Sequence, residues 1–154
     1  MLIVRPINND DCNAFITFAE ASGVGHTNLP NHPKRLAQKV NHSELSFAAS
    51  VEQAGEESYT FVMEDTQAGC LVGTCAVDAT VGLSELFFSY RVEEVVHASR
   101  DLNIHNRIPA LHLGHDYTGA SRLSSFYLEP DYRCNYYDQL LSKSRLLFMA
   151  CFPE

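Results

Sequence analysis

The residues with the clearest chemical potential lie near the C-terminal end, where a strand-like segment stops at a proline and leads through a short loop into a helix. The segment covers residues 126–133 with Pro130 inside it, and the helix is expected over residues 137–151. A helix start presents backbone N–H groups without helical acceptors, so it attracts phosphate or pyrophosphate. The edge of the preceding strand could pair with an amide-containing arm such as pantetheine. This combination suits coenzyme A, although an ordinary strand–helix connection has the same pattern.

Histidines form a second group of candidates. His112 and His115, with His105 nearby, could bind a metal, but strand periodicity would put His112 and His115 on opposite faces. We therefore expect no metal and predict solvated loop histidines. His97 could orient a substrate or act as a base, or it could be a structural histidine. The sequence has no Gly-x-Ser-x-Gly elbow and no plausible Cys/His pair, so covalent catalysis is not expected.

The bulk composition is that of a soluble globular protein with one domain, expected over residues 1–154, since 45% of the residues are hydrophobic and 19% charged. The formal charge of −8 argues against a general nucleic-acid binder and suits a cationic small-molecule substrate. No apolar run approaches the roughly 20 residues of a membrane span, and the first residues do not read as a signal peptide. We therefore expect a cytoplasmic protein without membrane or nucleic-acid partners.

The cysteines give no sign of a disulfide framework. There are five of them, an odd number, and no Cys-x-x-Cys pair occurs. Reduced, mostly buried thiols are therefore expected at Cys12, Cys70, Cys75, Cys134 and Cys151.

The apolar pattern predicts the elements that must position these groups. Strands are expected over residues 2–5, 59–64, 70–77, 87–96 and 121–128, and helices over residues 10–22, from Pro33 onward, and over 137–151. This order indicates an α/β or α+β fold with a largely antiparallel sheet. In the last helix, Lys143 and Arg145 are expected to lie off the buried side, which should consist of Leu140, Leu141, Ser144, Leu147, Phe148 and Cys151.

Two resemblances bear on this site. Pro130-Asp131-Tyr132-Arg133 before an apolar helix resembles the acyl-CoA-binding segment of the GCN5-related N-acetyltransferase superfamily. A closer resemblance, to the arginine N-succinyltransferase family and specifically its N-terminal half, rests on several segments that occur in family order across nearly the whole chain: residues 1–6, 22–30, 61–66, 81–83, 90–92, 96–99 and 140–145.

The resemblance implies a fold, a reaction and a set of site residues. The fold is acyl-CoA N-acyltransferase-like, a mixed and mostly antiparallel sheet flanked by helices. The family transfers succinyl from succinyl-CoA to the α-amino group of arginine in arginine catabolism. Arginine would approach from the side of residues 23–30 and His97, where His97 is the candidate catalytic residue. Phe126 matches a family position at the CoA thioester, and CoA would lie between Phe126, Tyr127 and Leu128 on one side and the loop of Arg133 and Asn135 on the other.

The sequence departs from this pattern at three residues. Arg133 keeps the first position of the superfamily loop, but Tyr136 and Asp138 replace its two small residues, from which we predict weakened or absent CoA binding. Arg122 stands where the family has a glutamate. It would either repel a guanidinium substrate or pair with a surface acid, and both interpretations remain open.

The length is a further departure. The resemblance implies family members of roughly twice this length, with a proton-donating histidine in their second half. An arginine N-succinyltransferase-like enzyme is the main interpretation. The alternative is a truncated or degenerate non-catalytic relative that acts as a dimer module or ligand-binding domain. In either case we expect an exposed apolar patch at the last strand and helix, and assembly as a homo-oligomer or with a partner subunit.

Overall fold

The computed structural model describes residues 1–23 and 28–152, which fall into two compact units. The first unit holds Met1–Thr80 and Ser121–Glu154, and the second is Val81–Ala120. The sheet of the first unit has the order β1-β2-β3-β6, and all its neighbouring strands are antiparallel. Its strands are β1 Leu2–Pro6, β2 Ser58–Asp65, β3 Cys70–Asp78 and β6 Arg122–Leu128.

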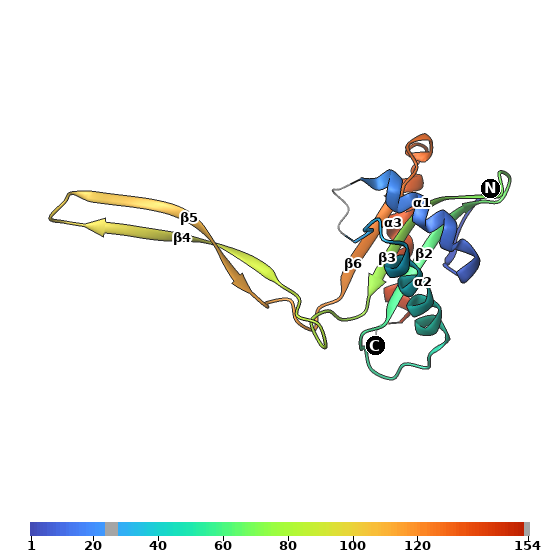
Figure 1. The fold of residues 1–154 in the computed structure, drawn as a ribbon, viewed down its shortest axis with the longest axis horizontal. Coiled ribbons are helices and arrows are strands. Elements are labelled where there is room, and N and C mark those ends of the chain that lie inside the picture. Colours follow the sequence, from blue (N-terminus) through green and yellow to red (C-terminus); the bar gives the residue numbers. More distant parts are fainter. Residues whose placement is uncertain (24–27, 153–154) are drawn as a thin grey trace. The chain divides into compact units, whose positions relative to one another are not determined.

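Helices cover both faces of this sheet (Figure 1). Helices α1 (Cys12–Ser22) and α2 (Pro33–Ala48) lie on one face, where Phe15, Leu36 and Val40 are fully buried. Helix α3 (Tyr137–Cys151) lies on the other face, where Leu141 packs with Leu128. No helix in the described part of the chain has the length and apolar character needed to cross a membrane.

The predicted elements agree closely with these bounds. Asn8 caps the short 3-10 helix η1 (Asn9–Asp11) in front of α1, and Pro33 occupies the first turn of α2, which begins where it was expected. Gly23 ends α1 with φ +75°, a conformation that glycine adopts without steric cost. Val24 and Gly25, which follow Gly23, lie outside the described residues.

An extra residue in β6 divides that strand into two halves. Ala76 of β3 pairs with Ser124, whereas Thr74 pairs with Tyr127, so one more residue separates the partners in β6 than in β3. Ser125 lies in this bulge with φ +52°. A bulge of one residue reverses the alternation of side chains along a strand. Phe126 therefore packs on the α3 face instead of sharing the α2 face with Ser124.

The buried side of α3 differs from the expected one. Leu140 and Leu147 were expected inside but are 46% and 67% exposed, and Cys151 is also exposed. Arg145 was expected outside but is buried, because its guanidinium lies over the Phe126 ring, 5.3 Å from the centroid, and donates to the Ser142 hydroxyl. The exposed leucines of α3 agree with the apolar patch expected at this helix.

The second unit is a two-stranded hairpin whose second strand was not predicted. Strand β4 (Ser89–Ser99) replaces the strand expected over residues 87–96, and it pairs along its whole length with β5 (Ile104–Gly114). His105 and His112 therefore lie in a strand, and their expected placement in a loop is wrong. β5 was not predicted because polar histidine, asparagine and arginine interrupt the pattern of its apolar residues on both faces.

The cysteines are free, as expected, but the prediction that most are buried is wrong. Only Cys75 is buried, whereas Cys12 is half-buried and Cys70, Cys134 and Cys151 are exposed. Cys75 lies in the middle of β3 with both faces covered, whereas the three exposed thiols lie near the ends of elements.

An ion-pair network joins β1 to the start of α1. Arg5 donates from both terminal nitrogens to the Asp11 carboxylate, at 2.7 and 2.9 Å, and from Nε to Glu64. Asp11 also accepts from the backbone N–H of Asn8. Burial alone would raise the pKa of Asp11, but the bonds from Arg5 and Asn8 outweigh it and hold that pKa below its usual value.

The network should make the stability of the fold depend on pH. Because the folded-state pKa of Asp11 is lowered, its contribution is present above the usual aspartate pKa and is lost as the pH falls through the folded-state pKa. We expect Asp11→Asn to lower the free energy of unfolding by about 1–3 kcal/mol near pH 7. The difference from wild type should shrink below about pH 4, as urea unfolding would show. Asp10→Asn, at the exposed neighbour, is the control, and an equal loss there would contradict the assignment.

Candidate functional site

The outer edge of β6 is open. β6 pairs with β3 on one side, and no strand among the described residues pairs with the other side. The N–H of Glu129 donates to the carbonyl of Val72 at 2.8 Å, so strand alternation turns the N–H groups of Leu128 and Phe126 away from β3. The carbonyl of Leu128 also faces outward, where it accepts from Nε of Arg133 at 2.8 Å. This edge can therefore bond to an extended amide chain.

A pocket of about 310 Å³ lies beside this edge. Four of the residues predicted to bind CoA line it: Phe126, Tyr127, Leu128 and Arg133. The fifth lining residue is Asp138, which was named as a departure from the family. The pocket thus combines apolar walls, one guanidinium and one carboxylate. Asn135, also predicted for CoA, belongs to the adjoining loop and does not line the pocket.

The loop before α3 has a left-handed backbone. Asn135 and Tyr136 have φ values of +51° and +63°, and Tyr136 is the N-cap of α3 without a capping side chain. Its ring is 75% exposed, so it does not fill the pocket. The N–H of Tyr137 donates to the Cys134 carbonyl, while the N–H groups of Asp138 and Gln139 have no acceptor within the helix. Tyrosine thus keeps the backbone shape that glycine would favour, and the helix start stays open.

Asp138 is the departure that affects the pocket. Its carboxylate stands in the first turn of α3, where it suits the partial positive charge of the helix start. A phosphate or diphosphate would be drawn to the same charge, and the two anions would repel each other. Arg133 also lines this pocket, and its positive charge offsets part of this repulsion.

A charged cluster lies on the other face of β6. Asp78 accepts from Ser58 at 2.7 Å, from Nε of Arg122 at 2.8 Å and from Ser124 at 3.1 Å. Burial would raise the pKa of Asp78, but the bonds from Ser58 and Arg122 and the charges of Lys39 and Arg122 lower it below its usual value. Of the two interpretations of Arg122, the structure supports pairing with an acid, although Asp78 is largely buried and not at the surface.

Lys39 of α2 joins this cluster and was missed by the sequence analysis. Its ammonium group donates to the hydroxyl of Ser125, which in turn donates to the carbonyl of Asn28 at 3.3 Å. Lys39 immediately precedes the buried Val40 and follows the buried Leu36 by three residues. A lysine at that spacing lies on the apolar stripe of its helix, and this was the available signal.

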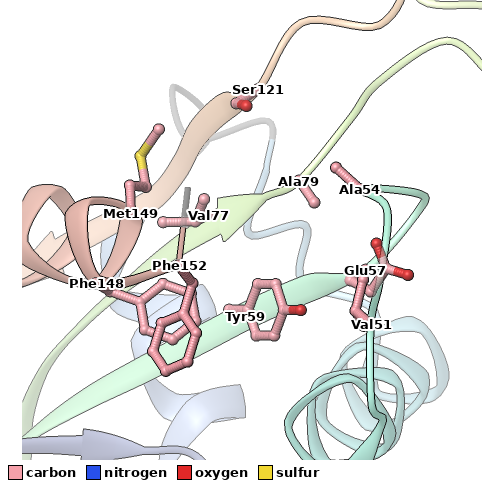
Figure 2. A pocket seen from close by; sticks show the side chains of 10 residues that line it. All are labelled: Val51, Ala54, Glu57, Tyr59, Val77, Ala79, Ser121, Phe148, Met149 and Phe152. Carbon is pink, nitrogen blue, oxygen red and sulfur yellow. The ribbon is translucent and has the colours of Figure 1, made fainter. Parts of the chain in front are cut away.

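A further cavity of about 140 Å³ lies near the C-terminal end of α3 (Figure 2). Phe148, Phe152 and Tyr59 form one wall of it, and Glu57 and Val51 stand opposite. Burial, with a smaller effect of Glu57, raises the pKa of Tyr59. None of the predicted site residues lines this cavity.

The remaining predicted site residues lie elsewhere. His97 is exposed on β4, directly opposite Asn106 of β5, in the hairpin unit. In the segment expected to face arginine, Leu29 is buried, but residues 24–27 lie outside the described residues. Within the two described ranges, no three His, Cys, Asp or Glu side chains gather in a group that could hold a metal.

Comparison with solved structures supports the fold. The structure of arginine/ornithine succinyltransferase subunit AI from Pseudomonas aeruginosa superposes with a TM-score of 0.91 at 50% identity, over 99% of this chain and 46% of that one. A predicted acetyltransferase with acetyl-CoA from Clostridium acetobutylicum matches with a TM-score of 0.53 at 12% identity, over 97% of this chain and 74% of that one. The second likeness shows the acyltransferase fold alone.

Sequence comparison identifies the family. The arginine N-succinyltransferase subunit alpha of Pseudomonas aeruginosa is 50% identical over all of this chain and 46% of its own length, and the arginine N-succinyltransferase of Escherichia coli is 38% identical over all of this chain and 44% of its own. The chain thus spans less than half the length of these relatives. A family model described as arginine N-succinyltransferase beta subunit matches residues 2–154. The chain therefore belongs to the arginine N-succinyltransferase family.

Proposed function

We propose that this chain takes part in the transfer of succinyl from succinyl-CoA to the α-amino group of arginine, and that it binds the CoA. The observation that carries the proposal is the meeting of two open backbone surfaces at one pocket, the outer edge of β6 and the start of α3. Each surface offers N–H groups that have no acceptor among the described residues, of the kind that the two polar parts of CoA require. The resemblance to full-length relatives supplies the substrates of the proposal.

The proposed CoA arrangement follows the strand into the helix. The pantetheine amides would pair with the outward N–H groups of Phe126 and Leu128. The diphosphate would accept from the N–H groups of Asp138 and Gln139, close to the Arg133 guanidinium. Asn135 would shape the loop through its left-handed backbone without contacting the acyl group. This arrangement places the thioester beside Phe126.

The proposed reaction is aminolysis of the thioester. The neutral arginine α-amine attacks the thioester carbonyl, and the resulting oxyanion accepts from a backbone N–H of β6. The C–S bond then breaks, and the CoA thiolate takes up the proton that the attacking nitrogen gives up, so that CoA leaves as a thiol. To become neutral before the attack, the amine must lose one proton, and we propose exposed His97 as the group that accepts it. The chain's net charge of −8 favours approach of the arginine cation. Binding and orientation of two substrates supply the rest of the catalysis.

We propose that the protein acts in the reducing environment of the cytoplasm and as part of an assembly. Free, exposed thiols at Cys70, Cys134 and Cys151 fit such an environment. An isolated two-stranded hairpin is marginally stable in water. The β4–β5 hairpin nevertheless exposes apolar cross-strand pairs, with Val92 at 71% opposite Leu111 at 67%. Their burial against a second copy or a partner subunit would stabilise the hairpin.

Self-association through this hairpin face can be tested by sedimentation velocity. Between about 1 and 100 μM, wild type should form dimers or larger species, because association buries the apolar hairpin face of one copy against that of another. Val92→Glu combined with Leu111→Lys should shift it toward monomer. Asn106→Lys lies on the opposite face of the hairpin and should leave the distribution unchanged. Monomeric wild type throughout that range would contradict self-association.

Two substitutions should separate CoA binding from proton transfer. Asp138→Asn removes the anion beside the proposed diphosphate site, so its affinity for succinyl-CoA should rise about threefold to tenfold in calorimetric titration. Glu52→Gln, at an exposed loop residue, should not change the affinity for succinyl-CoA.

His97→Ala should lower turnover with succinyl-CoA and arginine by about a hundredfold while leaving CoA affinity unaltered. Unchanged affinity in Asp138→Asn would refute the proposed diphosphate position, and unchanged turnover in His97→Ala would refute the proposed base.

A further inference from the structure

The side chain of Lys39 is partly buried and reaches into the charged cluster. It donates to the Ser125 hydroxyl, and it makes no ion pair with any carboxylate of the described residues. Asp78 lies near enough to interact with its charge, but the oxygens of Asp78 already accept from Arg122, Ser124 and Ser58. Lys39 therefore has donor capacity and positive charge that no carboxylate of the described residues takes up.

The electrostatics of the cluster favour an added anion. Lys39 and Arg122 bring two positive charges and Asp78 brings one negative charge. Burial lowers the pKa of Lys39, the repulsion from Arg122 lowers it further, and the attraction of Asp78 offsets this only in part. A bound carboxylate would complete the pairing of the ammonium group, which is how buried charges are usually stabilised.

The cluster lies next to the proposed thioester position. Ser125 directly precedes Phe126, and the bulge turns Ser125 toward Lys39 while Phe126 packs on the α3 face. Consecutive Cα atoms are about 3.8 Å apart, and the carboxylate carbon of a succinyl group lies about 4 Å from its thioester carbonyl carbon. A succinyl group whose thioester lies beside Phe126 could thus reach the hydroxyl of Ser125 and the ammonium group of Lys39.

We propose that Lys39, oriented by Ser125, binds a substrate carboxylate and determines the choice of substrate. Lys39 would recognise a substrate carboxylate that has no other charged partner in the site. The succinyl group carries one and the arginine acceptor carries another, and the distance along β6 favours the succinyl carboxylate. This inference rests on the proposed function, because both carboxylates come from its substrates.

The test is a comparison of affinities in wild type, Lys39→Met and Lys34→Met. Lys34 lies exposed on the same helix and provides the matched control. Butyryl-CoA has a methyl group in place of the succinyl carboxylate, and agmatine lacks the carboxylate of arginine. By calorimetry, wild type and Lys34→Met should bind succinyl-CoA about tenfold or more tightly than butyryl-CoA. Lys39→Met should lose this preference and keep its butyryl-CoA affinity, and thermal unfolding would confirm that it folds.

Each other result decides the inference. A succinyl preference that survives in Lys39→Met overturns it. Loss of the preference for arginine over agmatine in Lys39→Met, with the acyl preference intact, would support the carboxylate site and assign it to the acceptor. If no variant binds any CoA thioester, the proposed function fails, and free succinate becomes the probe of Lys39. Succinate should then raise the unfolding temperature of wild type but not of Lys39→Met, and equal shifts would overturn the inference.

Discussion

The bulge at Ser125 is the constraint on which the site depends. Without the extra residue, Phe126 would share the face of Arg122 and Ser124, beneath α1 and α2. With it, Phe126 joins Leu128 on the α3 face and forms a wall of the pocket next to the start of that helix. The bulge also holds the Ser125 hydroxyl against Lys39. One left-handed residue therefore brings a cationic group and a pocket wall to neighbouring positions of the same strand.

Groups of opposite charge lie at both ends of the proposed acyl-CoA site. At the diphosphate end, the helix start and Arg133 attract an anion while Asp138 repels it. At the acyl end, Asp78 stabilises Arg122 and leaves Lys39 without an ion pair among the described residues. The chain as a whole is anionic, so attraction of an anionic ligand must come from these local groups and not from the global field.

Sequence patterns predicted the elements better than they predicted which side chains each element buries. The β2–β3 hairpin and the bounds of α3 followed from strong apolar patterns with clear turns. The burial of Arg145 did not, because its guanidinium stacks on Phe126, a tertiary contact that only the bulge makes possible. The pocket residues Phe126 to Leu128 and Arg133 were named from a motif. The bulge itself had no sequence signal, since serine is not a residue that marks a left-handed position, and so the contact of Ser125 with Lys39 could not be predicted.

Amide hydrogen exchange with and without succinyl-CoA tests most directly whether the edge of β6 and the start of α3 bind the ligand together. Saturating ligand should slow exchange at Phe126, Leu128, Asp138 and Gln139, because each N–H gains an acceptor that the free protein lacks. The inner amides of β3 should change little, since they are already paired with β2 and β6. Binding of succinyl-CoA with unchanged exchange at these four amides would contradict the account.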